Sequence, residues 1–281
     1  MNPDFQGGST SSVVRAIQGL RDGSLTEAPT RDAATVVLLR DSATGPQAYL
    51  LRRVRQMAFA GGAHVFPGGS VDPDDKHVPA KMGWAGPDPH WWADRLRCDV
   101  PTARALVCAA VRETFEESGV LLAGPSENEV LADVSSDDWE AERVALEARE
   151  QSLSDLLARW SLVLRADLLR PYAHWVTPAM EPKRFDTRFF LAALPTGQVC
   201  RDVGTEADQR VWVRPVDALA ADWFLMRPTR VCLENLLGDE DVAAALDAER
   251  EIRSVSPVYD LDGDDQVVLL PDGATPSWSR S

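Results

Sequence analysis

The amino-acid sequence predicts a layered fold of the α/β or α+β class. Short apolar segments typical of strands occur on both sides of one long helical segment, and further strands and helices follow it. Elements that alternate in this way usually pack as layers around one core. With 281 residues, of which 44% are hydrophobic, the chain can build a sizeable core. We expect an N-terminal arm over residues 1–31 and one folded domain over residues 32–281.

In the first half of the chain, apolar periodicity predicts a hairpin, a glycine-rich loop and one long helix. The first strand consists of β-branched and aliphatic residues, so we expect it to be buried on both faces. The long helix has a proline in its first turn and Gly119 just past its end, as helix termini prefer. In chain order, the predicted elements are a short helix over residues 12–20, strands over 34–39 and 48–53, a glycine-rich loop over 61–69, an inserted loop over 73–100 and the long helix over 101–118.

In the second half, the pattern predicts one further amphipathic helix, followed by strands, helices and a hairpin. This helix lies in a helical insertion over residues 136–165, which we interpret either as a wall of a ligand pocket or as simple packing over the sheet. The C-terminal part over residues 228–281 supplies helices and a hairpin. The predicted elements are a helix over 136–160, strands over 172–177, 184–194 and 209–214, helices over 228–237 and 240–250, and a hairpin over 258–270.

The charge of the chain excludes several classes of partner. Its 44 acidic and 29 basic residues give a net charge of −15, which would repel nucleic acid and anionic membranes. No run of about 18 apolar residues occurs, so no transmembrane helix is predicted. The polar N-terminus shows no secretory signal. The four cysteines are scattered and form no C-x-x-C pair, which fits a reducing compartment. We therefore expect a cytoplasmic protein without nucleic-acid or membrane partners.

The end of the long predicted helix carries a cluster of glutamates. Glu113, Glu116 and Glu117 stand at i, i+3 and i+4, so they share one helix face. Each such pair of like charges costs roughly 0.2–0.5 kcal/mol, and the helix dipole also disfavours anions there. A divalent cation such as Mg²⁺, which takes oxygen ligands, would compensate these charges. The alternative is a solvated acidic helix face.

The segment from Arg112 to Val120 resembles the Nudix box, the signature of a family of diphosphatases. The box reads G-x5-E-x7-R-E-U-x-E-E-x-G-U, where U is a bulky apolar residue. Arg112, the three glutamates, Gly119 and Val120 match it position by position, and Gly69 matches the opening glycine. On these residues the chain is identified as a member of the Nudix family.

The box departs from the family pattern in three places. Asp75 stands where the first glutamate should be, and Thr114 replaces a bulky apolar residue. About 29 extra residues separate the glycine loop from the helix. A box with such an insertion resembles the branch that includes the peroxisomal coenzyme A diphosphatases, and the segments 63–69 and 184–190 are similar to that branch as well.

The resemblance implies both a fold and a reaction. The fold is an α/β/α sandwich around a mixed sheet, here with extra helices and an insertion inside the box. The reaction is hydrolysis of a nucleoside diphosphate linked to another group, with Mg²⁺ or Mn²⁺ as cofactor. The implied metal ligands are Glu113, Glu116, Glu117 and the backbone carbonyl of Gly68 or Gly69, the orienting residue is Arg112, and the structural box positions are Asp75 and Gly119.

A general base has to accept a proton from the attacking water within hydrogen-bond reach. Glu116 and Glu117 are candidates on the helix. Glu206, in a loop that enters a strand, and Glu181, in a Met-Glu-Pro loop, are rival candidates. The alternative for both loop glutamates is an exposed carboxylate without a catalytic role.

Arginines near the glycine loop are candidates for binding phosphate, because a guanidinium can pair with phosphate through two hydrogen bonds. Arg52, Arg53 and Arg55 form this cluster, and the backbone of Gly68 lies close to it in sequence. The alternative is that these arginines are solvated at a strand edge.

A second pair of candidate phosphate ligands, Arg184 and Arg188, lies on a predicted strand. At period two these arginines share one face with Asp186. A structural ladder of salt bridges is therefore the alternative for at least one of them.

The substrate that the resemblance favours is coenzyme A or acyl-coenzyme A, a small nucleotide-type molecule. Coenzyme A diphosphatases often carry a second pattern upstream of the glycine loop, which this chain keeps at Leu50, Arg53 and Gly62 but lacks at Val54 and Ala58. Hydrolysis of ADP-ribose, NADH or a nucleotide sugar is the first alternative. A Nudix-fold ligand-binding or regulatory module without catalysis is the second. Since family members commonly dimerise, a homodimer is also compatible with the sequence.

Overall fold

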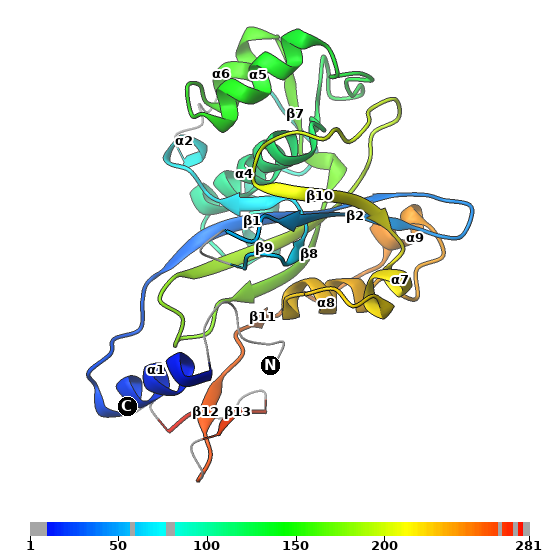
Figure 1. The fold of residues 1–281 in the computed structure, drawn as a ribbon. Coiled ribbons are helices and arrows are strands. Elements are labelled where there is room, and N and C mark those ends of the chain that lie inside the picture. The colour runs from blue at the N-terminus through cyan, green and yellow to red at the C-terminus, as the bar shows by residue number, and fades with distance from the viewer. Residues whose placement is uncertain (1–9, 57–59, 77–81, 264–265, 272–274, 278–281) are drawn as a thin grey trace.

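A mixed eight-stranded sheet forms the centre of the protein (Figure 1). The computed structural model describes residues 10–56, 60–76, 82–263, 266–271 and 275–277. The strand order is β10-β2-β1-β9-β8-β11, with β3 paired to β2 and β4 paired to β1. The strands of this sheet are β1 (Thr30–Arg40), β2 (Gln47–Arg53), β3 (His64–Val65), β4 (Gly68–Ser70), β8 (Leu169–Val176), β9 (Arg184–Ala193), β10 (Ala207–Val213) and β11 (Ser254–Val255).

The central strand β1 explains why the sheet is buried on both faces. It pairs in parallel with β9 along its whole length and in antiparallel with β2 and β4. Val36 and Leu38 contribute to one apolar core, whereas Val37 and Leu39 contribute to the core on the opposite face. This alternation follows from the two-residue period of a strand, and it confirms that the first strand is buried on both sides.

Helices cover both faces of the sheet, so the expected α/β/α sandwich is confirmed (Figure 1). The first face packs against α3 and α4, with the α5–α6 pair packed on the outer side of α4, and the second face packs against α7, α8 and α9. The helices of the sandwich are α3 (Pro89–Leu96), α4 (Val100–Ser118), α5 (Asp137–Glu147), α6 (Leu153–Arg159), α7 (Pro215–Ala220), α8 (Arg227–Glu234) and α9 (Val242–Asp247).

Helix α4 matches the predicted long helix, and local signals set both of its ends. The Asp99 side chain caps the first turn by accepting the backbone N–H of Thr102 at 2.7 Å. Gly119 ends the helix in the left-handed conformation, with φ of 72°. Thr114 is fully buried, and its hydroxyl donates to the backbone oxygen of Ala110 at 2.7 Å, so the position tolerates this departure from a bulky apolar residue.

Two predictions about the insertions are wrong in detail. The segment 73–100 is more than an inserted loop, since it contains α2 (Pro73–Lys76), β5 (Trp84–Ala85) and α3. Residues 77–81 of this segment lie outside the described part of the chain. The single helix predicted over 136–160 is two helices, because Ser152 starts α6 with a capping box that it forms with Asp155.

Smaller elements complete the fold. The predicted helix of the arm is α1 (Thr10–Asp22), which packs against the C-terminal hairpin through Val13, Ile17 and Tyr259. Residues 264–265 of this hairpin lie outside the described residues. Among the helices described, none has the length and apolarity needed to cross a bilayer. The remaining elements are β6 (Ala123–Gly124), β7 (Val163–Arg165), the 3₁₀ helix η1 (Ala166–Leu168), β12 (Tyr259–Leu261) and β13 (Val267–Leu269).

Candidate active site

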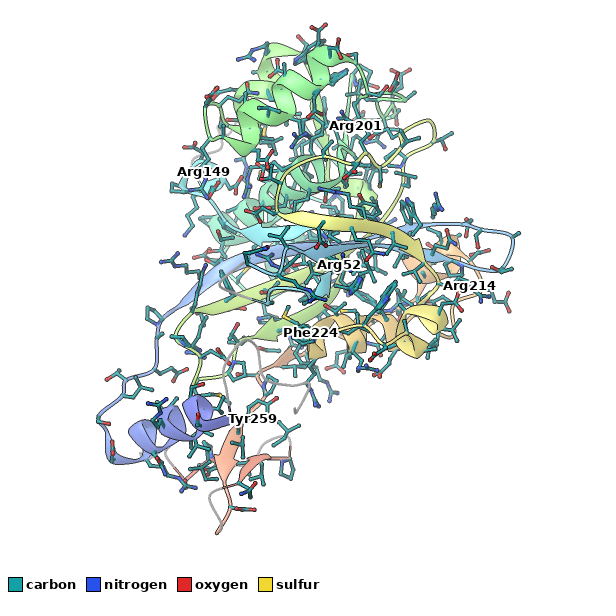
Figure 2. The ribbon with its side chains drawn as sticks, viewed as in Figure 1. Arg52, Arg149, Arg201, Arg214, Phe224 and Tyr259 are labelled. Atoms are coloured by element: carbon teal, nitrogen blue, oxygen red, sulfur yellow. The ribbon has the colours of Figure 1, made fainter. Side chains whose placement is uncertain are left out.

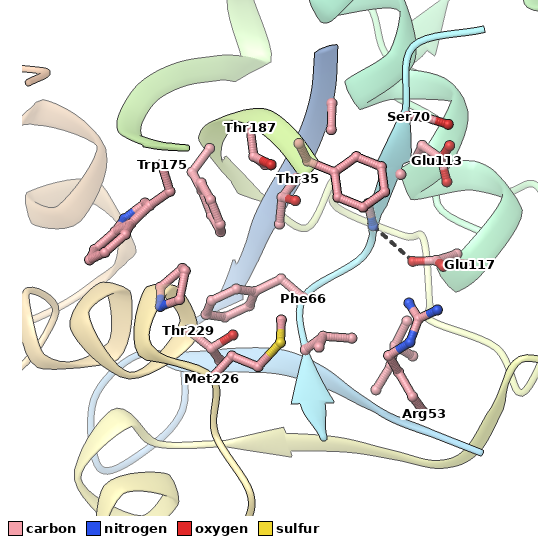
Figure 3. A pocket seen from close by; sticks show the side chains of 18 of the residues that line it. Thr35, Arg53, Phe66, Ser70, Glu113, Glu117, Trp175, Thr187, Met226 and Thr229 are labelled. Carbon is pink, nitrogen blue, oxygen red and sulfur yellow. Dashed lines mark hydrogen bonds between the residues drawn. The ribbon is translucent and has the colours of Figure 1, made fainter. Parts of the chain in front are cut away.

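One pocket of about 480 Å³ brings together the acidic end of α4, the glycine loop and one face of the sheet (Figure 3). Its two ends differ in chemistry. Glu113 and Glu117 lie at one end, whereas Phe66, Trp175 and Met226 form an apolar wall at the other end (Figure 3). A charged group and an apolar group of the same ligand could therefore bind side by side in this pocket.

The Arg112 guanidinium holds two of the helix carboxylates in place. Its Nη1 donates to Glu113 Oε1 at 2.8 Å and lies 3.1 Å from Glu116 Oε2. Arg112 is only 5% exposed, so these ion pairs are shielded from water. Arg112 therefore contacts the carboxylates of both Glu113 and Glu116 on the same helix.

Asp75 pairs with Arg112 from the other side. Nη2 of Arg112 donates to Asp75 Oδ2 at 2.9 Å, and Nε lies 3.2 Å from both carboxylate oxygens. The short helix α2 carries Asp75 to this position, where the side chain also accepts the backbone N–H of Asp72. The shorter aspartate therefore reaches the arginine despite the departure from the family pattern.

The glycine loop contacts the carboxylates through its backbone. The N–H of Gly68 donates to Glu117 Oε2 at 2.8 Å (Figure 3). At Gly69, the backbone packs so closely against Glu113 that a Cβ atom would displace the carboxylate of Glu113. Both glycines line the pocket. The loop and the helix thus meet as the box pattern predicts.

Burial raises the pKa values of all three helix carboxylates, and repulsion from neighbouring carboxylates adds to the effect. Burial, followed by repulsion from Glu113, raises the pKa of Glu116 to about 8. Burial and repulsion from Glu113 raise the pKa of Glu117 well above its usual value, against the opposing hydrogen bond from Gly68. Burial raises the pKa of Glu113 as well, although Arg112 opposes it. The cluster therefore has more negative charge than its protein partners balance.

The donor set fits a hard divalent cation. Carboxylate oxygens are the ligands that Mg²⁺ and Mn²⁺ take, and a cation would balance the charge of Glu113, Glu116 and Glu117. Within the described residues, no three His, Cys, Asp or Glu side chains already converge as a metal site. Arg112 and the Gly68 N–H hold carboxylate oxygens of the cluster instead.

Only one arginine of the first candidate cluster reaches the pocket. Arg53 lines it, and its Nη2 lies 4.0 Å from Glu206 Oε2. Arg52 instead pairs with Asp208 at 2.6 Å and does not line the pocket. Arg55 is exposed and does not line the pocket either. Of the upstream pattern, Ala58 lies outside the described residues.

The structure does not bring Arg184 and Arg188 into the pocket. Arg188 is buried, pairs with Asp186 and donates to the backbone oxygen of Leu96 in α3. Arg184 is also buried and pairs with Glu27 of the N-terminal segment. Phe185 and Thr187, which alternate with them along β9, line the pocket instead, because successive strand side chains point to opposite faces. Both arginines therefore have structural partners.

The two loop glutamates differ in position. Glu206 lines the pocket, and 62% of its side chain is exposed. Glu181 does not line the pocket, although partial burial raises its pKa. His64 is buried and stacks on Trp223 at 4.1 Å between ring centroids. Glu206 is thus the better placed of the two loop candidates.

Several residues of the pocket had no signal in the sequence analysis. The apolar wall combines Phe66 after β3, Trp175 in β8 and Met226 just before α8, which are far apart in the chain, so local periodicity could not group them. The unpredicted charged residues that line the pocket are Arg31, Asp72, Glu147, Arg149, Lys183, Arg210 and Arg227.

Known proteins with a similar sequence belong to one family. Residues 88–227 match the family model described as the NUDT19 Nudix domain. The chain is 26% identical to acyl-coenzyme A diphosphatase NUDT19 of Xenopus laevis over 201 residues, which cover 60% of this chain and 53% of that protein. It is 27% identical to the protein of the same name from Gallus gallus, with coverages of 67% and 62%. The chain therefore spans only about half to three-fifths of these relatives.

A solved structure matches over more of its length. The crystal structure of a NUDIX hydrolase from Alicyclobacillus acidocaldarius is 30% identical in sequence and superimposes with a TM-score of 0.68. The match covers 80% of this chain and 98% of that chain. Fold and sequence therefore agree on the same family.

Proposed function

Because the chain belongs to the Nudix hydrolase family, we propose that it is a metal-dependent diphosphatase acting on acyl-coenzyme A or coenzyme A. The observation that carries this proposal is the single pocket in which the box carboxylates face an apolar wall. The name of the NUDT19 relatives supports the same substrate class.

The metal would be held by Glu113, Glu116 and Glu117, with the backbone of Gly69 beside them. When bound, Mg²⁺ or Mn²⁺ would neutralise phosphate charge and lower the pKa of a coordinated water. Arg112 keeps the carboxylates of Glu113 and Glu116 turned toward each other, and Asp75 keeps Arg112 in place.

Glu206 is the residue that we propose as general base. It lines the same pocket but lies outside the helix carboxylates, so it can accept a proton without giving up a metal ligand. Arg53 approaches both Glu206 and the edge of the pocket, where a guanidinium can bind a phosphate oxygen. Glu181 does not line the pocket, which argues against it as the general base.

The apolar wall distinguishes the proposed substrate from the alternatives. The pocket offers an apolar surface for a pantetheine arm or an acyl chain, formed by Phe66, Trp175, Phe189 and Met226. ADP-ribose and nucleotide sugars have neither of these groups. All three helix glutamates of the box are present, which supports catalysis rather than a non-catalytic binding module.

A substrate panel tests the proposal. The protein would be incubated with Mg²⁺ or Mn²⁺ and with coenzyme A, acyl-coenzyme A esters, ADP-ribose, NADH or nucleotide sugars. We expect the highest kcat/KM for coenzyme A compounds and its loss in Glu116→Gln. A preference for ADP-ribose, or full activity of the variant, would overturn the proposal.

A further inference from the structure

Arg149 occupies a conformation that arginine rarely adopts. Its φ is +58°, in the left-handed region, directly after helix α5. The N–H of Arg149 donates to Leu146 O and that of Glu150 donates to Ala145 O, both at 2.9 Å. These two bonds define a Schellman ending, in which the left-handed position is usually glycine because a Cβ is strained there. The backbone is therefore strained at the residue that carries this side chain.

The Arg149 side chain points into the candidate active site. It lines the pocket, and it lies between the α5–α6 pair and the sheet (Figure 2). Its Nη2 pairs with Asp72 Oδ1 at 3.0 Å, while Asp72 Oδ2 lies 3.8 Å from Arg112. The Arg149 side chain is nevertheless 70% exposed, so N–H groups beyond this ion pair face solvent at the acidic end of the pocket.

The buried side chain of Arg143 links the end of α5 to α4. Arg143 donates to the backbone oxygen of Glu116 at 2.9 Å and to Glu147 Oε2 at 2.7 Å, and it is only 3% exposed. Glu147 lies two residues before Arg149 and lines the same pocket. The end of α5, which carries Arg149, is therefore tied to the helix that carries the box carboxylates.

We propose that Arg149 is a substrate-binding residue that pairs with a phosphate oxygen of the diphosphate. This inference rests on the proposed function, which puts the diphosphate at the acidic end of the pocket. A guanidinium suits this role because its planar N–H groups pair with phosphate through two bonds. Strain at a pocket residue is the pattern expected where a fold gives up stability for function.

The test uses two glycine variants that relieve the same kind of strain. Arg97 also has a left-handed φ, of +54°, at the end of α3, but it does not line the pocket. Affinity for α,β-methylene-ADP, a diphosphate that resists hydrolysis, would be measured by calorimetry with Mg²⁺. We expect Arg149→Gly to weaken this binding about 10-fold or more, and Arg97→Gly to leave it unchanged. Both variants should raise Tm by about 2–4 °C, because glycine removes the strain.

Three results would overturn the inference. In the first, the affinity of Arg149→Gly for the analogue lies within twofold of that of the wild type. In the second, the Tm of this variant is lower than that of the wild type. In the third, the wild-type protein does not bind the analogue. The proposed function fails separately, if the wild type hydrolyses no coenzyme A compound while Arg149→Gly still weakens binding of the analogue.

Discussion

The pH dependence of stability should reveal the charge imbalance in the active site. Burial and repulsion from Glu113 raise the pKa of Glu116 from its ordinary value of 4.5 to about 8 in the protein without metal. The unfolded chain therefore loses this proton before the folded protein does. Stability from this group is complete below about pH 4.5 and is lost as the pH rises toward 8.

The size of this effect follows from the two pKa values. Each unit of pH between them costs about 1.4 kcal/mol, and the Glu116 side chain is only 12% exposed, so screening by solvent is small. Ionisation of Glu116 should cost about 1 kcal/mol at pH 5 and about 4 kcal/mol at pH 7.5. Glu116→Gln cannot ionise, so its stability relative to the wild type should grow by about 3 kcal/mol between these pH values.

Urea unfolding in EDTA at pH 5.0 and 7.5 measures this difference. Glu150→Gln, at an exposed position, is the matched control and should show no pH-dependent gain. Adding Mg²⁺ at pH 7.5 should stabilise the wild type more than Glu116→Gln, because the cation offsets the buried charge. A free-energy gap between Glu116→Gln and the wild type that does not change with pH would refute the reasoning.

Three further changes test other parts of the site. Asp75→Asn leaves Arg112 without its charged partner, so we expect a loss of about 3 kcal/mol in the free energy of unfolding, measured with urea; an unchanged value would contradict the pairing. Glu206→Gln should lower kcat about 100-fold or more at similar KM, whereas Glu181→Gln should keep the wild-type kcat; the reverse order would exchange their roles. Met226→Asp puts a charge on the apolar wall. In steady-state assays it should raise KM about 10-fold for long-chain acyl-coenzyme A, with little change for coenzyme A. Equal changes in KM for the two substrates would exclude an acyl site there.

The parts of the site that depend on local spacing could be predicted from the sequence. Glu113, Glu116 and Glu117 share a face because an α-helix has 3.6 residues per turn. Asp75 was expected at the missing glutamate position, and the structure shows its contact with Arg112. Such relations involve residues that are close in sequence or belong to one motif.

The parts that depend on long-range pairing could not be predicted. Period two correctly put Arg184 and Arg188 on one face of β9, but the pairing of β9 with β1 and the packing of α3 decide which face lines the pocket. Arg149 was missed because the helix over 136–160 was expected to be continuous. The spacing of Ser152 and Asp155, typical of a capping box, was the available signal for the break.

Product identification tests the central claim most directly. The protein would be incubated with Mg²⁺ and a long-chain acyl-coenzyme A. The products would be separated by chromatography and identified by mass spectrometry. We predict two products that each retain one phosphate of the cleaved diphosphate, an acyl-phosphopantetheine and a 3′-phosphorylated AMP, with none formed in EDTA or by Glu116→Gln. Intact acyl-coenzyme A, or release of the free acyl group with the diphosphate uncut, would contradict the account.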